Sequence, residues 1–405
     1  MTQLSFTAST RGTGRLVDSP EPGRLKPSRP DAGFSITLLH SAVELAGIAA
    51  DLEDLAAAAL EPSVFYEPWM FLPAVEAYAA NSALQFVLVH GRERVLCGFF
   101  PLERRGHWRG IPFRVARIWR HVHCALGTPL IRADQARACW ACFLNWLARD
   151  PSGASLLELP FVTGDGPFQQ LLIDDAHQRG VLSYCVETFT RALFRPRHNA
   201  DDYIVGALSG KHRQELRRQE RRLSELGTLR YAALEPDADA EVWVNAFLEL
   251  ERRGWKGREG TALVRQEADR KFFQTFCREA ARRGRLQMLG LFLNDRPIAL
   301  KCNLLTGDGA LAFKIAFDEE FARHSPGVLL ELFTIDRLHA QPRVAWMDSC
   351  AIPDHPMINR LWLDRRTIQT LLISTGRAPG DVIVSLLPAL RWLKRLYRGR
   401  NVPLS

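Results

Sequence analysis

Three short apolar segments separated by tight turns dominate the second half of the sequence. Residues 286–293, 298–305 and 311–317 are rich in Leu, Ile, Phe and Ala, and the turns between them contain Asn-Asp and Gly-Asp-Gly. Turns of this kind connect β-hairpins, so the segments predict an antiparallel meander of three strands. A helical pattern over 326–338 and another strand over 344–348 follow. This order of meander, helix and strand favours a mixed α/β class of fold.

Helical patterns also precede the meander, over 208–226, 241–253 and 268–283. In the first half of the chain, residues 84–90 and 95–102 are predicted to form a β-hairpin, and further helices accompany it. The first half therefore has a looser version of the same order. We predict an α/β (α+β) fold in which each half has a mixed, mainly antiparallel sheet flanked by helices.

The length of the chain predicts more than one domain, because 405 residues exceed the usual size of a single hydrophobic core. Residues 1–33 scatter Ser, Thr, Gly, Pro and Arg, and we interpret them as a disordered tail. An N-terminal domain is expected over 34–194 and a C-terminal domain over 195–405. A strand near 368–373 and a helix over 382–397 are expected to complete the C-terminal domain.

The composition is that of an ordinary soluble protein, with 47% hydrophobic and 24% charged residues. The sequence contains no run of about 18 apolar residues, the usual indication of a transmembrane helix. Its beginning lacks the apolar core of a secretory signal, so we expect a cytoplasmic protein. The formal net charge of +8 suits an anionic partner, such as a nucleic acid, an acidic membrane surface or a phosphate-bearing cofactor.

The eight cysteines show no spacing typical of a disulfide framework or a zinc site. The one Cys-x-x-Cys pair, Cys139 and Cys142, lies in a segment with helical periodicity that is rich in Trp and Phe. We therefore interpret both side chains as part of the core and predict no metal site.

Several segments of the second half resemble a known family of enzymes. Residues 250–263, 312–330 and 347–362 look like the branch of the GNAT acyltransferases that is related to CelD-type acetyltransferases of cellulose biosynthesis. The overall layout, including the basic helix at 209–227, also resembles the FemAB peptidyltransferases, which are tandem GNAT folds. The resemblance covers roughly residues 35–400 and implies two GNAT-like domains, with the working site in the second.

The resemblance implies direct transfer of an acyl group, with acetyl the expected one, from acyl-CoA to an amine or hydroxyl. The expected acceptor is a small molecule or saccharide, such as a cell-envelope or exopolysaccharide precursor. One alternative is FemAB-like transfer of an aminoacyl group from charged tRNA, which we favour less. Another is a catalytically inactive scaffold subunit that contacts a membrane complex of polysaccharide synthesis at its periphery.

The usual GNAT pyrophosphate-loop signature is absent, and residues 323–327 take its place at the start of a helix. Ser325 is predicted to cap that helix with its side chain, and Gly327 to let a ligand approach the backbone. The helix N-terminus and the charge of Arg323 would then attract the phosphates of CoA. The other interpretation is a well-capped helix start that binds nothing.

The alternation of side chains along the meander places Lys301 and Asn303 on one face of their strand and Lys314 among alanines on the next. An unpaired buried ammonium is costly, so these faces predict the floor of a cleft. On this interpretation Lys314 contacts the cofactor, and Lys301 and Asn303 contact the substrate. The alternative is that the polar face is the solvent side of the sheet.

Asp348 ends a predicted strand, and a loop interrupted by Pro carries His355 seven residues later. The intrinsic pKa of an imidazole suits a general base, so we predict that His355 deprotonates the acceptor and Asp348 orients it or acts as the base itself. Asn359 and Arg360, in the same region, are candidates for substrate binding. The alternative is a network of Arg and Asp ion pairs that only holds the loop.

Trp255 and Lys256 lie in a Gly-flanked segment and could close over the substrate, although Trp255 could equally be a wedge between helices. The basic helix at 211–222 could hold the phosphates of tRNA. It contains scattered acids and no aromatic residues, so we interpret it as a solvated surface of the fold.

Overall fold

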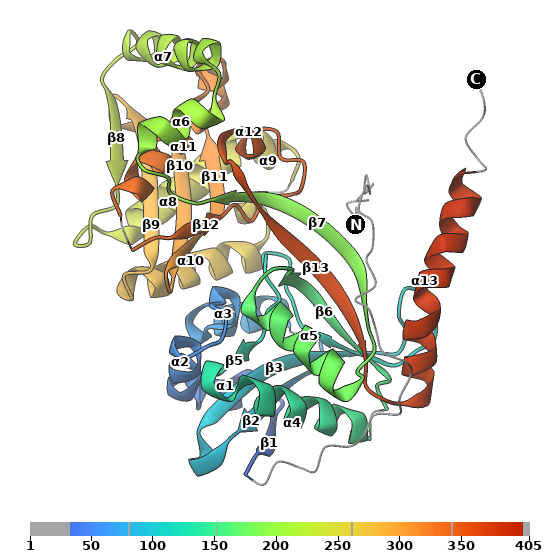
Figure 1. Ribbon diagram of the computed structural model, residues 1–405. Helices are drawn as coiled ribbons and strands as arrows, with labels where there is room; N and C mark the ends of the chain where they lie inside the picture. The colour runs from blue at the N-terminus through green and yellow to red at the C-terminus, as the bar shows by residue number, and fades with distance from the viewer. Residues whose placement is uncertain (1–32, 80–81, 152, 261, 342, 400–405) are drawn as a thin grey trace.

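The computed structural model describes residues 33–79, 82–151, 153–260, 262–341 and 343–399. These residues form a 13-stranded sheet with flanking helices, arranged in two lobes that long curved strands connect (Figure 1). Among the described strands, the pairs β4–β6 and β11–β12 are parallel and the others are antiparallel. The predicted class, a mixed α/β fold with mainly antiparallel pairing and flanking helices, is confirmed.

The first lobe is built from the following strands and helices: β1 (Ser35–Leu39), α1 (Ala42–Ala46), α2 (Ala49–Ala57), α3 (Pro68–Tyr78), β2 (Leu84–His90), β3 (Leu96–Arg105), β4 (Val115–Ile118), β5 (Leu130–Ile131), α4 (Ala136–Arg149), β6 (Leu156–Thr163) and α5 (Pro167–Arg179). Strand β7 (Ser183–Phe194) leads from this lobe to the second. The predicted hairpin of β2 and β3 is present. Cys139 is fully buried in α4 and Cys142 is half-buried there, as expected of core side chains.

The second lobe contains α6 (Ala200–Ala207), α7 (Gly210–Ser224), β8 (Leu229–Ala233), α8 (Ala240–Arg253), α9 (Trp255–Arg258), α10 (Glu267–Arg282), β9 (Leu286–Leu293), β10 (Arg296–Thr306), β11 (Gly309–Phe317), α11 (Pro326–His339), β12 (Trp346–Asp348) and α12 (Ile358–Leu361). Strands β9, β10 and β11 pair in order, so the predicted meander is confirmed. Asn294 and Asp295 both have positive φ in the first turn, as a tight hairpin turn requires.

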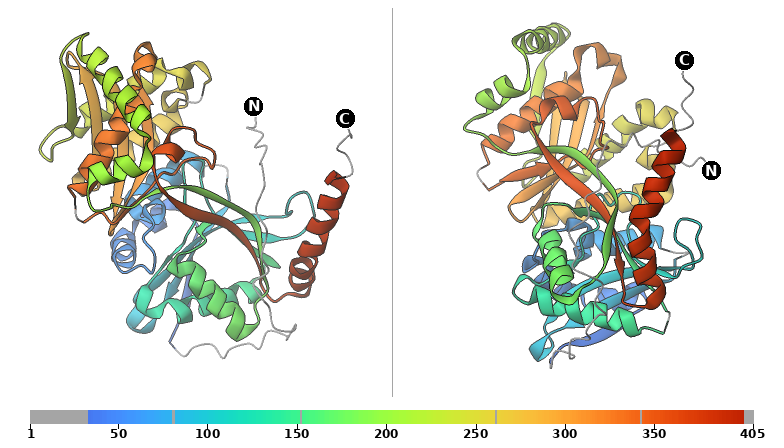
Figure 2. Two further views of the ribbon diagram at one scale, coloured as in Figure 1. Left: turned by 45° about the horizontal axis from the view of Figure 1, so that its top comes forward. Right: turned by 45° about the vertical axis from the view of Figure 1, so that its right-hand side comes forward.

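The last strand of the chain, β13 (Asp364–Ser374), lies between β6 and β7. It is the strand that unites the sheets of the two lobes, and with β7 it forms the curved band between them (Figure 2). The final helix, α13 (Ala378–Gly399), buries Val384 and Leu387 in a small core with β4 and β6 of the first lobe. The strand and helix expected to complete the C-terminal domain thus pack on the first half of the chain. The division at residues 194 and 195 stays a prediction.

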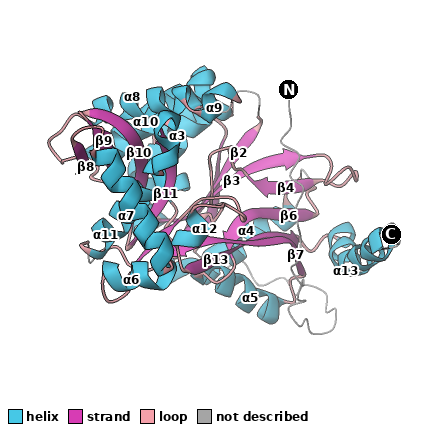
Figure 3. Cartoon of the chain, turned by 90° about the horizontal axis from the view of Figure 1, so that it is seen from above, coloured by secondary structure: helices cyan, strands magenta, loops and turns pink. Residues whose placement is uncertain are grey.

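The sheet of the second lobe has helices on both faces (Figure 3). Helices α8 and α10 cover one face, in a core that continues through α3 into the first lobe. Helices α6, α7 and α11 cover the opposite face in a second core. Within the described residues, no helix is long and apolar enough to cross a membrane.

Candidate functional site

Strand β11 contains a β-bulge near its centre. Asn303 of β10 lies opposite Ala312, but the preceding residue, Cys302, lies opposite Lys314. Phe313 is therefore an extra residue in β11. Bulges redirect side chains and occur often beside active sites, so this point of the sheet is the first indication of a site.

The bulge also corrects the predicted faces of this strand. Phe313 packs against Phe276 of α10, with ring centroids 4.9 Å apart, and the Nζ of Lys314 lies 3.7 Å from Oε1 of Glu251 on α8. Both side chains thus lie on the α8 and α10 face, whereas Ile315 contacts the core on the α11 face. The predicted alternation is wrong beyond Phe313, because a single extra residue inverts every later position.

Strands β11 and β12 pair only at their beginnings. Gly309–Leu311 lie beside Trp346–Asp348, where β12 ends. From Ala312 to Phe317, β11 has no strand neighbour on that side among the described residues. Residues 312–315 are half-buried, although β11 lies in the interior of the sheet. The pairing of β11 with β12 therefore ends next to the bulge.

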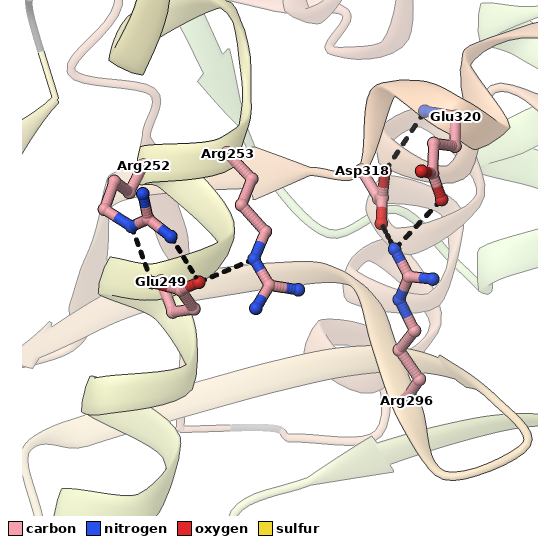
Figure 4. A network of polar contacts seen from close by, with 6 residues as sticks. All are labelled: Glu249, Arg252, Arg253, Arg296, Asp318 and Glu320. Atoms are coloured by element: carbon pink, nitrogen blue, oxygen red, sulfur yellow. Dashed lines mark hydrogen bonds and ion pairs between the residues drawn. The ribbon is translucent and has the colours of Figure 1, made fainter.

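The loop that leads from β11 to α11 is anchored by charged side chains (Figure 4). Arg296, at the start of β10, donates to the carboxylates of Asp318 and Glu320, at 3.0 Å in the second case. Asp318 also accepts from the N–H of Glu320 at 3.1 Å and so caps the 3-10 helix Glu319–His324. The segment before α11 is therefore fixed on the end of the meander.

Figure 4 also shows a second ion group, at the end of α8. Glu249 accepts hydrogen bonds from Arg252 and from Arg253, at 2.6–2.8 Å. The hydrogen bonds from Arg252, together with those from Arg253, lower the pKa of Glu249 to about 2. All three side chains are largely exposed, so the group contributes little stability.

Ser325 does occupy the N-cap position of α11, but its side chain makes no capping hydrogen bond. Its backbone is left-handed, with φ 51°, and its carbonyl accepts from the N–H groups of Val328 and Leu329. The prediction of a side-chain cap is therefore wrong, because a residue in this conformation does not direct its hydroxyl toward the first turn.

The neighbours of Ser325 lie in different surroundings. Gly327 is buried, and a Cβ there would meet the ring of Phe317 at 3.4 Å, so this glycine lies against protein atoms. Arg323 is exposed, and its Nε donates to Nε2 of His324 at 3.0 Å. The charge of Arg323 is thus accessible beside the start of α11, and its role in binding a cofactor stays a prediction.

Lys301 and Asn303 lie in the interior rather than in a cleft or on a solvent face. The Nζ of Lys301 donates to Oε2 of Glu331 on α11 at 2.6 Å, and both side chains are almost completely buried. Asn303 is fully buried and donates to Oε1 of Gln287 at 3.0 Å. The predicted cleft floor is corrected here, because α11 covers this face and supplies the carboxylate for the lysine.

Asp348 joins two arginines at the point where the lobes meet. Arg191 on β7 and Arg366 on β13 are directly opposite each other, and both donate to Oδ2 of Asp348, at 2.8 and 3.1 Å. Burial by itself would raise the pKa of Asp348, but the charges of the two arginines outweigh it and hold the pKa below its usual value. The carboxylate is therefore an ionised anchor, as in the predicted network of Arg and Asp ion pairs.

His355 is half-buried, and its Nδ1 accepts from the N–H of Ile358 at 3.3 Å. Asn359 donates to the carbonyl of Pro353 at 2.5 Å, and Arg360 is exposed. The carboxylate of Asp348 is occupied by arginines and by the N–H of Cys350, so its contacts give no support to an Asp348–His355 pair. The functions predicted for His355, Asn359 and Arg360 stay predictions. Trp255 and Lys256 begin the short helix α9, and their side chains lie outside the described part of the chain.

Sequence reasoning did not identify a cluster of polar and aromatic rings between the lobes. Tyr78, His121 and His123 come from the first lobe, and Asp269 and Phe272 from α10. The rings of Tyr78 and His121 are stacked at 5.2 Å, and those of His123 and Phe272 at 6.0 Å. The spacing of the histidines, two residues apart, was the only signal in the sequence, and nothing indicated their partner on a helix far along the chain.

Comparison with known proteins agrees with this architecture. Residues 210–355 match the family model described as acetyltransferase (GNAT) domain. No curated protein sequence matches the chain. The structure is similar to that of FemX, with a TM-score of 0.51 and 9% identity over 86% of this chain and 100% of FemX. At so low an identity, this likeness shows the fold alone.

Two further solved structures are similar over most of their length. L-PGS from Bacillus licheniformis has a TM-score of 0.48 and 10% identity, over 84% of this chain and 95% of that one. A tandem GNAT protein from the clavulanic acid biosynthesis pathway has a TM-score of 0.43 and 16% identity, over 84% of this chain and 99% of that one. The residues that match the acetyltransferase (GNAT) domain, 210–355, contain the bulged β11 and the start of α11.

Proposed function

We propose that the protein transfers an acyl group, with acetyl the expected one, from acyl-CoA to an amine or hydroxyl of a saccharide or cell-envelope precursor. The observation that carries the proposal is the bulge in β11, which lies just beyond the point where its pairing with β12 ends. This arrangement lies within the GNAT domain and next to the start of α11. The saccharide class of the acceptor rests on the resemblance to CelD-type enzymes.

The surroundings of the bulge suit an acyl-CoA donor. The pantetheine arm can lie along β11 beyond the end of β12, as an added strand would. The positive end of the α11 dipole and the exposed Arg323 favour phosphate oxygens. The donor would thus have its phosphates at α11 and its thioester near the bulge.

The cysteines near the centre of the molecule favour direct transfer to the acceptor. Burial raises the pKa of Cys124 and of Cys350 to about 12, so both stay protonated near neutral pH. A thiol is a poor nucleophile compared with a thiolate. A covalent intermediate on either cysteine is therefore disfavoured, as the GNAT resemblance implies.

Two substitutions at Ser325 test the position of the donor. Asp and Asn both tolerate the left-handed conformation of this residue, but only Asp adds a negative charge. Ser325→Asp should weaken the binding of CoA and acetyl-CoA in calorimetric titrations and keep the melting temperature, since an acid suits a helix start. Ser325→Asn is the matched control and should bind like the parent. Equal affinity of all three proteins would show that the phosphates bind elsewhere.

The second candidate is aminoacyl transfer from charged tRNA, and the outer face of α7 favours it. Arg217, Arg221 and Arg222 are exposed there, and the structure shows no ion pair for them among the described residues. Filter binding of tRNA to the parent and to a variant with Arg217→Glu and Arg221→Glu distinguishes the candidates. Tight binding with a steep salt dependence that the variant loses would favour aminoacyl transfer over acyl-CoA.

A further inference from the structure

A carboxylate and an imidazole form a hydrogen-bonded pair between the two lobes. Nε2 of His123 lies 3.0 Å from Oδ1 of Asp269, and the hydroxyl of Tyr78 donates to the same oxygen at 2.7 Å. Burial would raise the pKa of Asp269, but the hydrogen bonds from His123 and Tyr78 outweigh it and hold the pKa below its usual value. Asp269 is therefore ionised and can only accept hydrogen bonds.

The state of Asp269 fixes the tautomer of its partner. Because the carboxylate accepts, Nε2 of His123 carries the proton in this hydrogen bond. In the neutral imidazole, Nδ1 then holds the lone pair. Among the described residues, Nδ1 of His123 has no hydrogen-bond partner. The imidazole is thus oriented through one nitrogen and has a basic nitrogen at the other side.

This pair lies beside the bulge of β11. The ring of His123 is 6.4 Å from that of Phe313, the extra residue of the bulge, measured between centroids. The charge of Lys314, the next residue, also acts on Asp269. The pair is therefore on the face to which the bulge directs Phe313 and Lys314, next to the proposed position of the thioester.

A second histidine in the cluster has unfilled hydrogen-bonding capacity. His121 is 5% exposed, and within the described residues neither of its ring nitrogens has a hydrogen-bond partner. A buried polar group without a partner is costly, and such groups occur where a ligand supplies the missing bond. The centroid of the His121 ring is 6.4 Å from that of His123, so one acceptor molecule could reach both.

We propose that His123, oriented by Asp269, is the general base that deprotonates the acceptor, and that His121 binds the acceptor through a hydrogen bond. This inference rests on the proposed acyl transfer and adds that the first lobe completes the active site of the second. The acceptor N–H or O–H gives its proton to Nδ1 of His123. At the same time, a lone pair of the acceptor nitrogen or oxygen forms a bond to the thioester carbon. The C–S bond breaks, and the thiolate of CoA leaves with the electron pair of that bond. The thiolate then takes up the proton from His123.

The chain also supplies the support that such a base needs. Arg191 donates from its Nη1 to the carbonyl of Ala125 at 3.0 Å while its other nitrogens bind Asp348. Arg120 donates to the carbonyl of Cys124 at 2.6 Å. The loop that follows the two histidines is therefore tied to β7, and through Asp348 to β12. Strand β12 in turn pairs with the start of β11, just before the bulge.

The kinetic test uses the full chain with acetyl-CoA as donor. The acceptors are a panel of amino sugars, sugar alcohols and water, and the measured product is the free thiol of CoA. His123→Gln should lower kcat by about 10²–10⁴-fold, the usual effect of losing a general base, and leave the Kd for acetyl-CoA unchanged. Asp269→Asn should lower kcat with little change in KM, and Asp269→Glu should recover part of the rate. His177→Gln, an exposed histidine of α5, is the matched control and should behave like the parent.

Chemical footprinting of the histidines provides a measurement that does not depend on the identity of the acceptor. Diethyl pyrocarbonate modifies accessible imidazoles, and mass spectrometry locates each modified histidine. Saturating acetyl-CoA should protect His123 and leave His177 reactive, because only the first lies beside the bound acyl group. A merely structural His123 would lower the melting temperature on substitution but would show no protection by the donor.

The outcomes separate the inference from the function on which it rests. Loss of kcat at unchanged donor affinity, with protection of His123, supports the inference. A normal kcat for His123→Gln, a loss with His355→Ala instead, or a reactive His123 in the donor complex overturns it while acyl transfer stands. If the parent protein does not bind acetyl-CoA at all, the proposed function is overturned and the inference with it.

Discussion

Lys301 and Glu331 form an ion pair of 2.6 Å between β10 and α11, and their side chains are 1% and 2% exposed. The ring of Trp362 lies 5.3 Å from the Nζ of Lys301 and covers the pair. Burial lowers the pKa of Lys301, while the charge of Glu331 opposes this effect. The two charges are thus stable in the core only as long as both are present.

Removing one member of this pair should be far more costly than removing both. Lys301→Met leaves Glu331 as an uncompensated buried charge and is expected to lower the free energy of unfolding by about 3–5 kcal/mol. Lys301→Met with Glu331→Leu should recover to within about 1 kcal/mol of the parent, or exceed it. Urea denaturation of the two variants measures the difference. Equal losses would mean that the pair acts through something other than its charges.

Asp348 should act mainly on stability. Asp348→Asn leaves Arg191, which is 2% exposed, without its counter-charge, and a loss of about 3–5 kcal/mol in unfolding free energy is expected. Asp364→Asn breaks the half-exposed pair with Arg197 and is the control, with an expected loss below about 1 kcal/mol. Chemical denaturation of both variants gives the comparison. A small loss at Asp348, with activity abolished, would instead return this residue to the mechanism.

The stability of the protein should depend on His121 in weak acid. Burial, with the charges of His123 and Arg120, lowers the pKa of His121 well below its usual value, so the folded protein keeps it neutral. The unfolded chain takes up a proton near pH 6.5, so the free energy of unfolding falls as the pH falls below that value. At pH 5.5 this cost is about 1.4 kcal/mol. His121→Phe should remove this cost, which denaturation curves at pH 7.5 and 5.5 measure. An equal change in the free energy of unfolding between the two pH values in both proteins would contradict the prediction.

The start of β11 should not tolerate a side chain. A Cβ on Gly309 would lie 2.1 Å from the ring of Trp346 in β12, so Gly309→Ala must displace the strand that ends at Asp348. We expect a loss of about 1–3 kcal/mol from overpacking, measured by urea denaturation. A Cβ on Gly106 meets nothing within 4 Å, and Gly106→Ala is the control that should be neutral. Similar losses at both sites would show that β12 adjusts freely.

The sequence was informative where a local pattern determines the structure. The Asn294-Asp295 turn and the apolar runs beside it predicted the meander, because turn chemistry and strand propensity agree there. The alternation in β11 was predicted correctly only as far as Phe313, since nothing in the residues themselves marks a bulge. The prediction that Lys301 lies on the floor of a cleft was wrong because its partner, Glu331, lies 30 residues further along the chain.

The candidate site was harder to predict because its residues come from both lobes and are far apart in the sequence. His123 and Asp269 are 146 positions apart, and no periodicity connects them. The sequence drew attention to Asp348 by its place at a strand end, but could not show that Arg191 and Arg366 occupy its carboxylate. Contacts of this kind depend on the order of strands across the whole sheet.

The position of β13 determines when the protein can fold during its synthesis. Residues 364–374 leave the ribosome well after β6 and β7, yet they fill the space between those two strands. Until they emerge, both of those strands have an unpaired edge that can join another nascent chain. Folding of the first lobe therefore cannot finish as that lobe is translated, and the interval before β13 emerges is the period of greatest risk of aggregation.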